Sequence, residues 1–74
     1  MSATVYVLLI QDRHTDTDVQ VFASRSQAID AAMSHSLKYN RGWDLVERTG
    51  RPYDEYWCEY GESCTVQVLK REVQ

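Results

Sequence analysis

The N-terminal part of the chain holds two apolar runs separated by a polar stretch. Thr4 to Gln11 is rich in β-branched and aromatic residues and is apolar at both odd and even positions, which favours a central strand of a sheet. Val19 to Ala23 alternates in polarity and predicts a second, shorter strand. Asp12 to Asp18 contains no apolar residue and many turn formers, so we expect it to form the hairpin loop between the two strands.

A helix is predicted after the second strand. Ser24 and Gln27 have the spacing of a capping box, in which the two side chains accept hydrogen bonds from amide groups at the helix start. We expect the helix to end near Tyr39 and Asn40, before Gly42. Six residues follow the spacing of a helical stripe that should face the sheet: Ala28, Ile29, Ala32, Met33, Ser36 and Leu37.

The segment that follows the helix fits no single period. Trp43, Leu45 and Val46 match neither the helical spacing nor the alternation of a strand. We predict a short helical turn from Asp44 to Thr49 that ends at Gly50, with an additional strand as the alternative.

Two strands are predicted at the C-terminal end. Tyr53 to Tyr60 and Ser63 to Glu72 surround a Tyr-Gly-Glu-Ser turn that is typical of a hairpin. The order ββαββ predicts a single α+β domain over residues 1–74, with a four-stranded antiparallel sheet and one amphipathic helix packed on one face. The simplest strand order places the strands as second, first, third and fourth. The sheet face without the helix is then either solvated or a docking surface.

Size and charge narrow the classes of function. A chain of 74 residues buries only a thin core, so we expect function on a surface rather than in a deep cavity. The net charge of -3 and the pI near 5.2 repel phosphate groups, which disfavours nucleic acid as a partner. The longest apolar run, Val5 to Ile10, is too short to cross a bilayer and lacks the features of a signal peptide. We therefore expect a cytoplasmic protein without a membrane partner.

The first loop carries four potential metal ligands at alternate positions, namely Asp12, His14, Asp16 and Asp18. Carboxylates with one imidazole suit a divalent ion such as manganese or zinc. The calcium-loop pattern is not met, because position 14 is histidine and no glycine follows Asp16. A solvated hairpin loop explains the same residues, since loops are normally hydrophilic. We expect no metal or cofactor, and keep this ligand set as an alternative.

The sequence does not predict a catalytic site. His14 has the chemistry of a general base, but no serine or cysteine nucleophile has a predictable position beside it. We therefore expect no enzymatic activity. Cys58 and Cys64 flank the last hairpin, and a three-residue loop centred on Gly61 would place them directly opposite each other, close enough for a bridge. In a cytoplasmic protein we expect two reduced thiols that pack as small apolar groups.

Aromatic and acidic residues are concentrated between residues 53 and 62. Strand alternation separates Tyr56, Cys58 and Tyr60 from a second set made of Tyr53, Glu55, Trp57 and Glu59. One set can pack under the helix. The second set, on the uncovered face, would join rigid aromatic anchors to carboxylates, which is the composition of a hot spot for a basic partner. The alternative is that Trp57 merely covers the second sheet face.

Several short motifs resemble those of a known group of proteins. They are Asp-Arg-His-Thr-Asp at residues 12–16, the Phe22-x-Ser24 strand exit, the alanine-rich helix and the Tyr-Gly-Glu turn. With them the chain resembles small uncharacterised bacterial proteins, chiefly actinobacterial. The resemblance implies the fold and the importance of residues 12–16, and it implies no activity. Cys58 and Cys64 depart from that group.

The layout is also similar to that of small phage-encoded ββαββ inhibitors, including certain anti-CRISPR proteins. We therefore hypothesise a non-enzymatic binding protein, in the form of a stoichiometric phage or mobile-element inhibitor, whose partner is a protein with a basic surface. A metal- or ligand-binding domain and a structural subunit or homodimer are the alternatives. The expected interface consists of Asp12, Arg13, His14, Asp16, Asp18, Tyr53, Asp54, Glu55, Trp57, Glu59 and Glu62.

Overall fold

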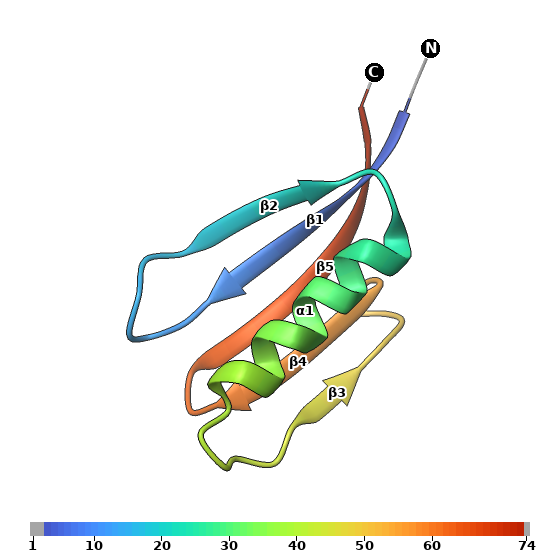
Figure 1. Ribbon diagram of the computed structural model, residues 1–74. Coiled ribbons are helices and arrows are strands. Elements are labelled where there is room, and N and C mark those ends of the chain that lie inside the picture. The colour runs from blue at the N-terminus through green and yellow to red at the C-terminus, as the bar shows by residue number, and fades with distance from the viewer. Residues whose placement is uncertain (1–2, 74) are drawn as a thin grey trace.

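A computed structural model, which describes residues 3–73, has five antiparallel strands in one sheet and one helix across a single face of it (Figure 1). The strand order is β2-β1-β5-β4-β3. The elements are β1 (Ala3–Gln11), β2 (Asp18–Phe22), α1 (Arg25–Tyr39), β3 (Val46–Arg48), β4 (Tyr56–Gly61) and β5 (Cys64–Val73). The helix α1 is neither long nor apolar enough to cross a membrane.

The prediction of an α+β fold is confirmed, but the prediction of a four-stranded sheet is wrong. Val46–Arg48 pairs with β4 as a fifth strand, in the register Val46↔Glu59 and Arg48↔Trp57. The helical turn predicted for residues 44–49 is therefore wrong as well, and the alternative of an additional strand is correct. A segment of three residues is too short for its polarity pattern to distinguish a strand from a helix. Its secondary structure is determined by the backbone pairing with β4.

The strand order also differs from the simplest arrangement of two hairpins. The last strand, β5, lies next to β1, between β1 and β4. In the simplest arrangement β4 would be the neighbour of β1, and β5 would lie outside it. β1 and β5 pair along the whole of β1, from Ala3↔Val73 to Gln11↔Thr65. Both are long and rich in β-branched residues, so their pairing gives the sheet a buried centre with the shorter strands outside it.

The helix begins and ends as predicted, but its buried face is narrower. The Ser24 hydroxyl accepts a hydrogen bond from the Gln27 amide at 3.4 Å, as an N-cap residue should. Three small residues, Ala28, Ala32 and Ser36, are 0% exposed. The predicted stripe also included Met33 and Leu37, which are 40% and 63% exposed. Small side chains allow the helix to approach the sheet closely, so these two longer ones remain outside the contact.

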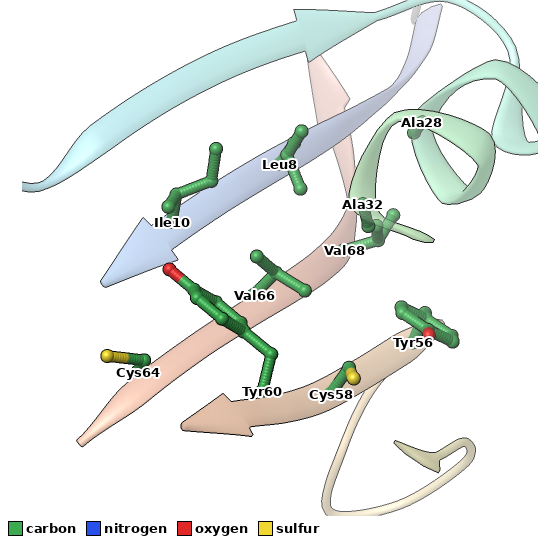
Figure 2. Packing of buried hydrophobic residues seen from close by; sticks show 10 residues of the cluster. All are labelled: Leu8, Ile10, Ala28, Ala32, Tyr56, Cys58, Tyr60, Cys64, Val66 and Val68. Carbon is green, nitrogen blue, oxygen red and sulfur yellow. The ribbon is translucent and has the colours of Figure 1, made fainter. Parts of the chain in front are cut away.

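The core lies between α1 and the sheet (Figure 2). The register places Leu8 beside Val68 and Ile10 beside Val66, so the apolar residues of the two central strands form one layer. The β4 residues Tyr56, Cys58 and Tyr60 extend this layer, and all three are buried. The even positions of β4 therefore face the helix.

The opposite face of the sheet carries no helix among the residues described. We call it the open sheet face. Val7 lies on it between Val21 of β2 and Leu69 of β5, and Val19 and Val21 are 55% and 63% exposed. Because strand residues alternate between the two faces, its members are Ala3, Val5, Val7, Leu9, Gln11, Val19, Val21, Val46, Arg48, Trp57, Glu59, Thr65, Gln67, Leu69, Arg71 and Val73.

Candidate functional site

The β1–β2 loop, the β4–β5 turn and the C-terminal end of α1 meet at one end of the molecule, opposite the end of the sheet where Ala3 pairs with Val73 (Figure 1). They surround a cavity of about 390 Å³. This volume is in the lower part of the range for small-molecule pockets. The domain thus contains a cavity, whereas its small size led us to expect none of this kind. The lining includes Asp12, His14, His35, Arg41, Trp43 and Cys64.

Asp12 is the most strongly held side chain of this cavity. Asp12 directly follows β1 and continues the alternation in which Leu8 and Ile10 face the helix. Its side chain therefore lies on the helix side of the sheet. One carboxylate oxygen accepts a hydrogen bond from the Tyr60 hydroxyl at 2.7 Å, and the other accepts one from the His14 backbone amide at 2.8 Å. These two hydrogen bonds, the Tyr60 bond first, lower the pKa of Asp12 below its ordinary value. Asp12 is therefore a fixed negative charge at neutral pH.

Tyr60 connects Asp12 to the helix. Its hydroxyl reaches from β4 across β5 to the end of β1 (Figure 2). The same oxygen lies 3.1 Å from Nε2 of His35, with the two rings edge to face. Because the hydroxyl donates its single proton to Asp12, the Nε2–H group of His35 must be the donor to Tyr60. Burial lowers the pKa of His35, and burial together with the Asp12 bond raises the pKa of Tyr60.

Cys64 lies beside Asp12. The ladder between β1 and β5 ends at Gln11↔Thr65, so the next residues of the two strands, Asp12 and Cys64, are neighbours on the helix side of the sheet. The candidate ligand atoms of Asp12, His14 and Cys64 all lie within 4.8 Å of one another. Sequence reasoning missed Cys64 as a member of this group, because the pairing of β1 with β5 has no local signal.

The four loop residues considered as metal ligands are not brought together as one set. Asp12 and His14 are in contact with the cavity, whereas Asp16 and Asp18 are not part of the group that they form with Cys64. The Asp18 carboxylate instead accepts a hydrogen bond from the Gln20 side chain at 3.1 Å. Asp16 is exposed.

The two surfaces singled out from the sequence meet at this end of the molecule. Arg13 of the β1–β2 loop lies 3.4 Å from Glu62 of the β4–β5 turn. Both side chains are mostly exposed, so this ion pair stabilises the fold by less than about 1 kcal/mol. The partly buried hydrogen bond from Tyr60 to Asp12 also connects the β4 segment to the β1–β2 loop.

The aromatic and acidic segment divides between the two faces of the sheet. Trp57 lies on the open sheet face, and the ring of Tyr53 packs against it with 5.3 Å between centroids. Glu59 lies on the same face, between Val46 and Thr65.

Two carboxylates of this segment have partners elsewhere in the chain. Glu55 pairs with Arg25 at the start of α1, at 2.9 Å, and Asp54 lies 3.7 Å from Arg71. Of the segment 53–62, the residues that remain available to a partner on the open sheet face are therefore Tyr53, Trp57 and Glu59.

The two cysteines are not opposite each other, which corrects the expected geometry. Cys58 is the partner of Val66, and Cys64 is the partner of Gly61. Glu62 and Ser63 form a two-residue turn with a left-handed φ of 59° at Ser63, so the three-residue loop does not occur. Both thiols are free and buried.

No protein-family model, curated protein or solved structure matched this chain. The resemblance to small actinobacterial proteins and to phage-encoded inhibitors therefore stays a prediction.

Proposed function

We propose that the protein is a non-enzymatic binding protein that docks onto another protein through its open sheet face. The observation that carries this proposal is the placement of α1 on one side of the sheet only, with an aliphatic surface opposite. Val19 and Val21 are more than half exposed there. Apolar surface that remains uncovered and is bordered by polar groups is typical of interaction sites.

The aromatic half of this face has the composition of a binding hot spot. Trp57 is partly buried and packs against Tyr53, so its large ring is held in place before any partner arrives. Glu59 is partly buried nearby and forms no ion pair with any residue in the described range 3–73. A Lys or Arg of a partner would give this carboxylate its missing counter-ion.

Net charge favours a different protein over a second copy as the occupant. Two copies of this chain would each bring a charge of -3, and their long-range fields would repel. A partner with an apolar patch bordered by basic groups would be attracted instead. Such tight, stoichiometric docking by a small domain is the mode of action of a phage or mobile-element inhibitor of the anti-CRISPR type. The two free cysteines suit a reducing compartment such as the cytoplasm.

Affinity capture with matched variants tests the docking face. The tagged full chain and its Trp57→Ala variant are compared in lysate of the native host, with quantitative mass spectrometry as the readout. Leu37→Ala, which removes an exposed apolar side chain from the helix, is the control. We expect one protein to be enriched by wild type and Leu37→Ala, and its recovery to fall at least tenfold with Trp57→Ala, by the ~2 kcal/mol of a hot-spot residue. Equal recovery by all three proteins would contradict the proposal.

Light scattering across a range of concentrations tests the identity of the occupant. We expect a monomer throughout, because the charge of the chain opposes self-association. A dimer at low concentration that is abolished by Val21→Glu would show that a second copy occupies the face, and would overturn the proposal of a different partner.

A further inference from the structure

The cavity brings together three side chains of different ligand chemistry. Asp12 supplies a carboxylate, His14 an imidazole and Cys64 a thiol, and their ligand atoms lie within 4.8 Å of one another. Cys64 is buried, Asp12 is half-buried and His14 is exposed, so the group extends from the core to the surface of the cavity. A tetrahedral metal ion with bonds of about 2.0 to 2.3 Å requires ligand atoms somewhat closer than this, which small side-chain rotations can supply.

Backbone geometry places each of the three residues. Asp12 and Cys64 are neighbours because the β1–β5 ladder ends just before them. His14 is folded back over Asp12 by two bonds of the loop: its own amide donates to the Asp12 carboxylate, and the Thr15 amide donates to the Asp12 carbonyl at 3.1 Å. The ligands thus come from the end of the sheet and from a tight turn that these two hydrogen bonds close.

Side chains outside the group orient the carboxylate. Tyr60 donates to one oxygen of Asp12 and is itself held by His35. An outer layer of hydrogen bonds that fixes ligand orientation is usual in metal sites. Each Asp12 oxygen that accepts one hydrogen bond keeps a second lone pair for coordination.

We propose that Asp12, His14 and Cys64 bind a zinc ion, with the fourth coordination position facing the cavity. The thiolate selects a borderline ion over calcium or magnesium, which prefer sites made of oxygen alone. Three protein ligands with one open position are the usual arrangement of an accessible zinc site, where water takes the fourth place. Binding displaces the proton of the Cys64 thiol, which passes to the buffer.

This site is separate from the proposed docking face. The three ligands lie on the helix side of the sheet and at the hairpin end, whereas the docking residues lie on the opposite face. Zinc binding by the isolated chain therefore succeeds or fails independently of any partner protein.

Calorimetric titration of the metal-free full chain with zinc chloride is the primary test. We expect one ion per chain, bound more tightly than about 10 μM, and at least 100-fold weaker binding for His14→Ala and Cys64→Ala. Asp16→Asn is the matched control, because Asp16 lies in the same loop and outside the group. Its affinity should stay within about twofold of wild type.

Cobalt spectroscopy provides a second measurement that does not depend on whether a ligand variant folds. Cobalt bound by wild type should give the near-ultraviolet charge-transfer band of a thiolate ligand, and zinc should protect Cys64 from alkylation by iodoacetamide. Tyr60→Phe, which removes only the hydroxyl that positions Asp12, should weaken zinc binding about tenfold. Zinc binding no tighter than about millimolar, absence of the thiolate band, or an equal loss with Asp16→Asn would overturn the proposal.

Discussion

At the scale of single residues, Asp12 links the loop to the core of the protein. Its carboxylate accepts hydrogen bonds from the Tyr60 hydroxyl and the His14 amide, and Tyr60 in turn accepts a hydrogen bond from His35 on the helix. One chain of hydrogen bonds therefore connects β1, β4 and α1. Such a network gives a half-buried side chain one orientation and one charge state.

Removing the Tyr60 hydroxyl should release Asp12. In Tyr60→Phe we expect the pKa of Asp12 to rise toward its ordinary value, because the hydrogen bond that lowers it most is lost. The free energy of unfolding should fall by about 1 to 2 kcal/mol. Carboxyl NMR titration of the metal-free protein and urea denaturation measure the two effects. Tyr56→Phe is the control, since that hydroxyl donates to Glu47 at 2.6 Å, and an equal change in Asp12 there would refute the assignment.

His35 should make the protein less stable in mild acid. Burial lowers its pKa in the folded state, while Asp12 and Asp18 raise it and Lys38 lowers it further. Below about pH 6.5 the unfolded chain therefore binds more protons than the folded one, and the free energy of unfolding falls as the pH falls.

Urea denaturation with a chelator present, at about pH 7.5 and about pH 5.5, measures this loss. We expect His35→Gln to lose less stability than wild type over this interval. All other titratable groups are common to both proteins, so the difference isolates His35. Equal losses would exclude the contribution of His35.

At the scale of elements, the helix packs on the sheet through its smallest side chains. Ala28, Ala32 and Ser36 have no exposed surface, and the Ser36 hydroxyl donates to the Ala32 carbonyl at 3.0 Å, so it needs no partner from the sheet. The distance between helix and sheet is thus set by three small side chains, and the contact leaves no free space around them. Larger residues are accepted only at the edges of the contact.

A larger side chain in this contact should be destabilising. We expect Ala32→Leu to lower the free energy of unfolding by about 1 to 3 kcal/mol, because the added carbons must displace the helix or the sheet. Ser34→Leu, at an exposed position of the same helix, should change it by less than about 0.5 kcal/mol. Urea denaturation measures both values, and similar values for the two variants would show that the helix can move away from the sheet at little cost.

Local signals decided which elements could be predicted. The Ser24 cap and the apolar run of β1 lie within a few residues, so the helix and the strand follow from the sequence. The strand Val46–Arg48 does not, because its state depends on a partner in β4. Cys64 could not be placed beside Asp12 for the same reason, since their proximity follows from the β1–β5 register.

At the scale of the whole molecule, the sheet has two unequal faces. One is covered by α1 and contains the core together with the cavity, and the other carries aliphatic side chains with Trp57 and Glu59 among them. The alternation of β4 was enough to predict that Trp57 and Glu59 would share a face. The apolar extent of that face was not predictable, because it requires the order of all the strands.

Charge at the open sheet face should govern recognition of a basic partner. We expect Glu59→Gln to weaken binding of the captured protein and to reduce the dependence of its affinity on salt, because the carboxylate would no longer pair with a Lys or Arg. Titrations of the purified partner at low and high ionic strength measure this. An unchanged salt dependence would show that the partner approaches through other groups.

Site-specific photo-crosslinking in the native host tests the central claim most directly. A photoreactive residue is placed at Val21 or Leu69 on the open sheet face, and at Leu37 on the helix as the control. We predict a crosslinked product with one other protein from the two sheet positions and none from position 37. Crosslinks from position 37 alone, or products made only of two copies of this chain, would contradict docking of a different protein on the open sheet face.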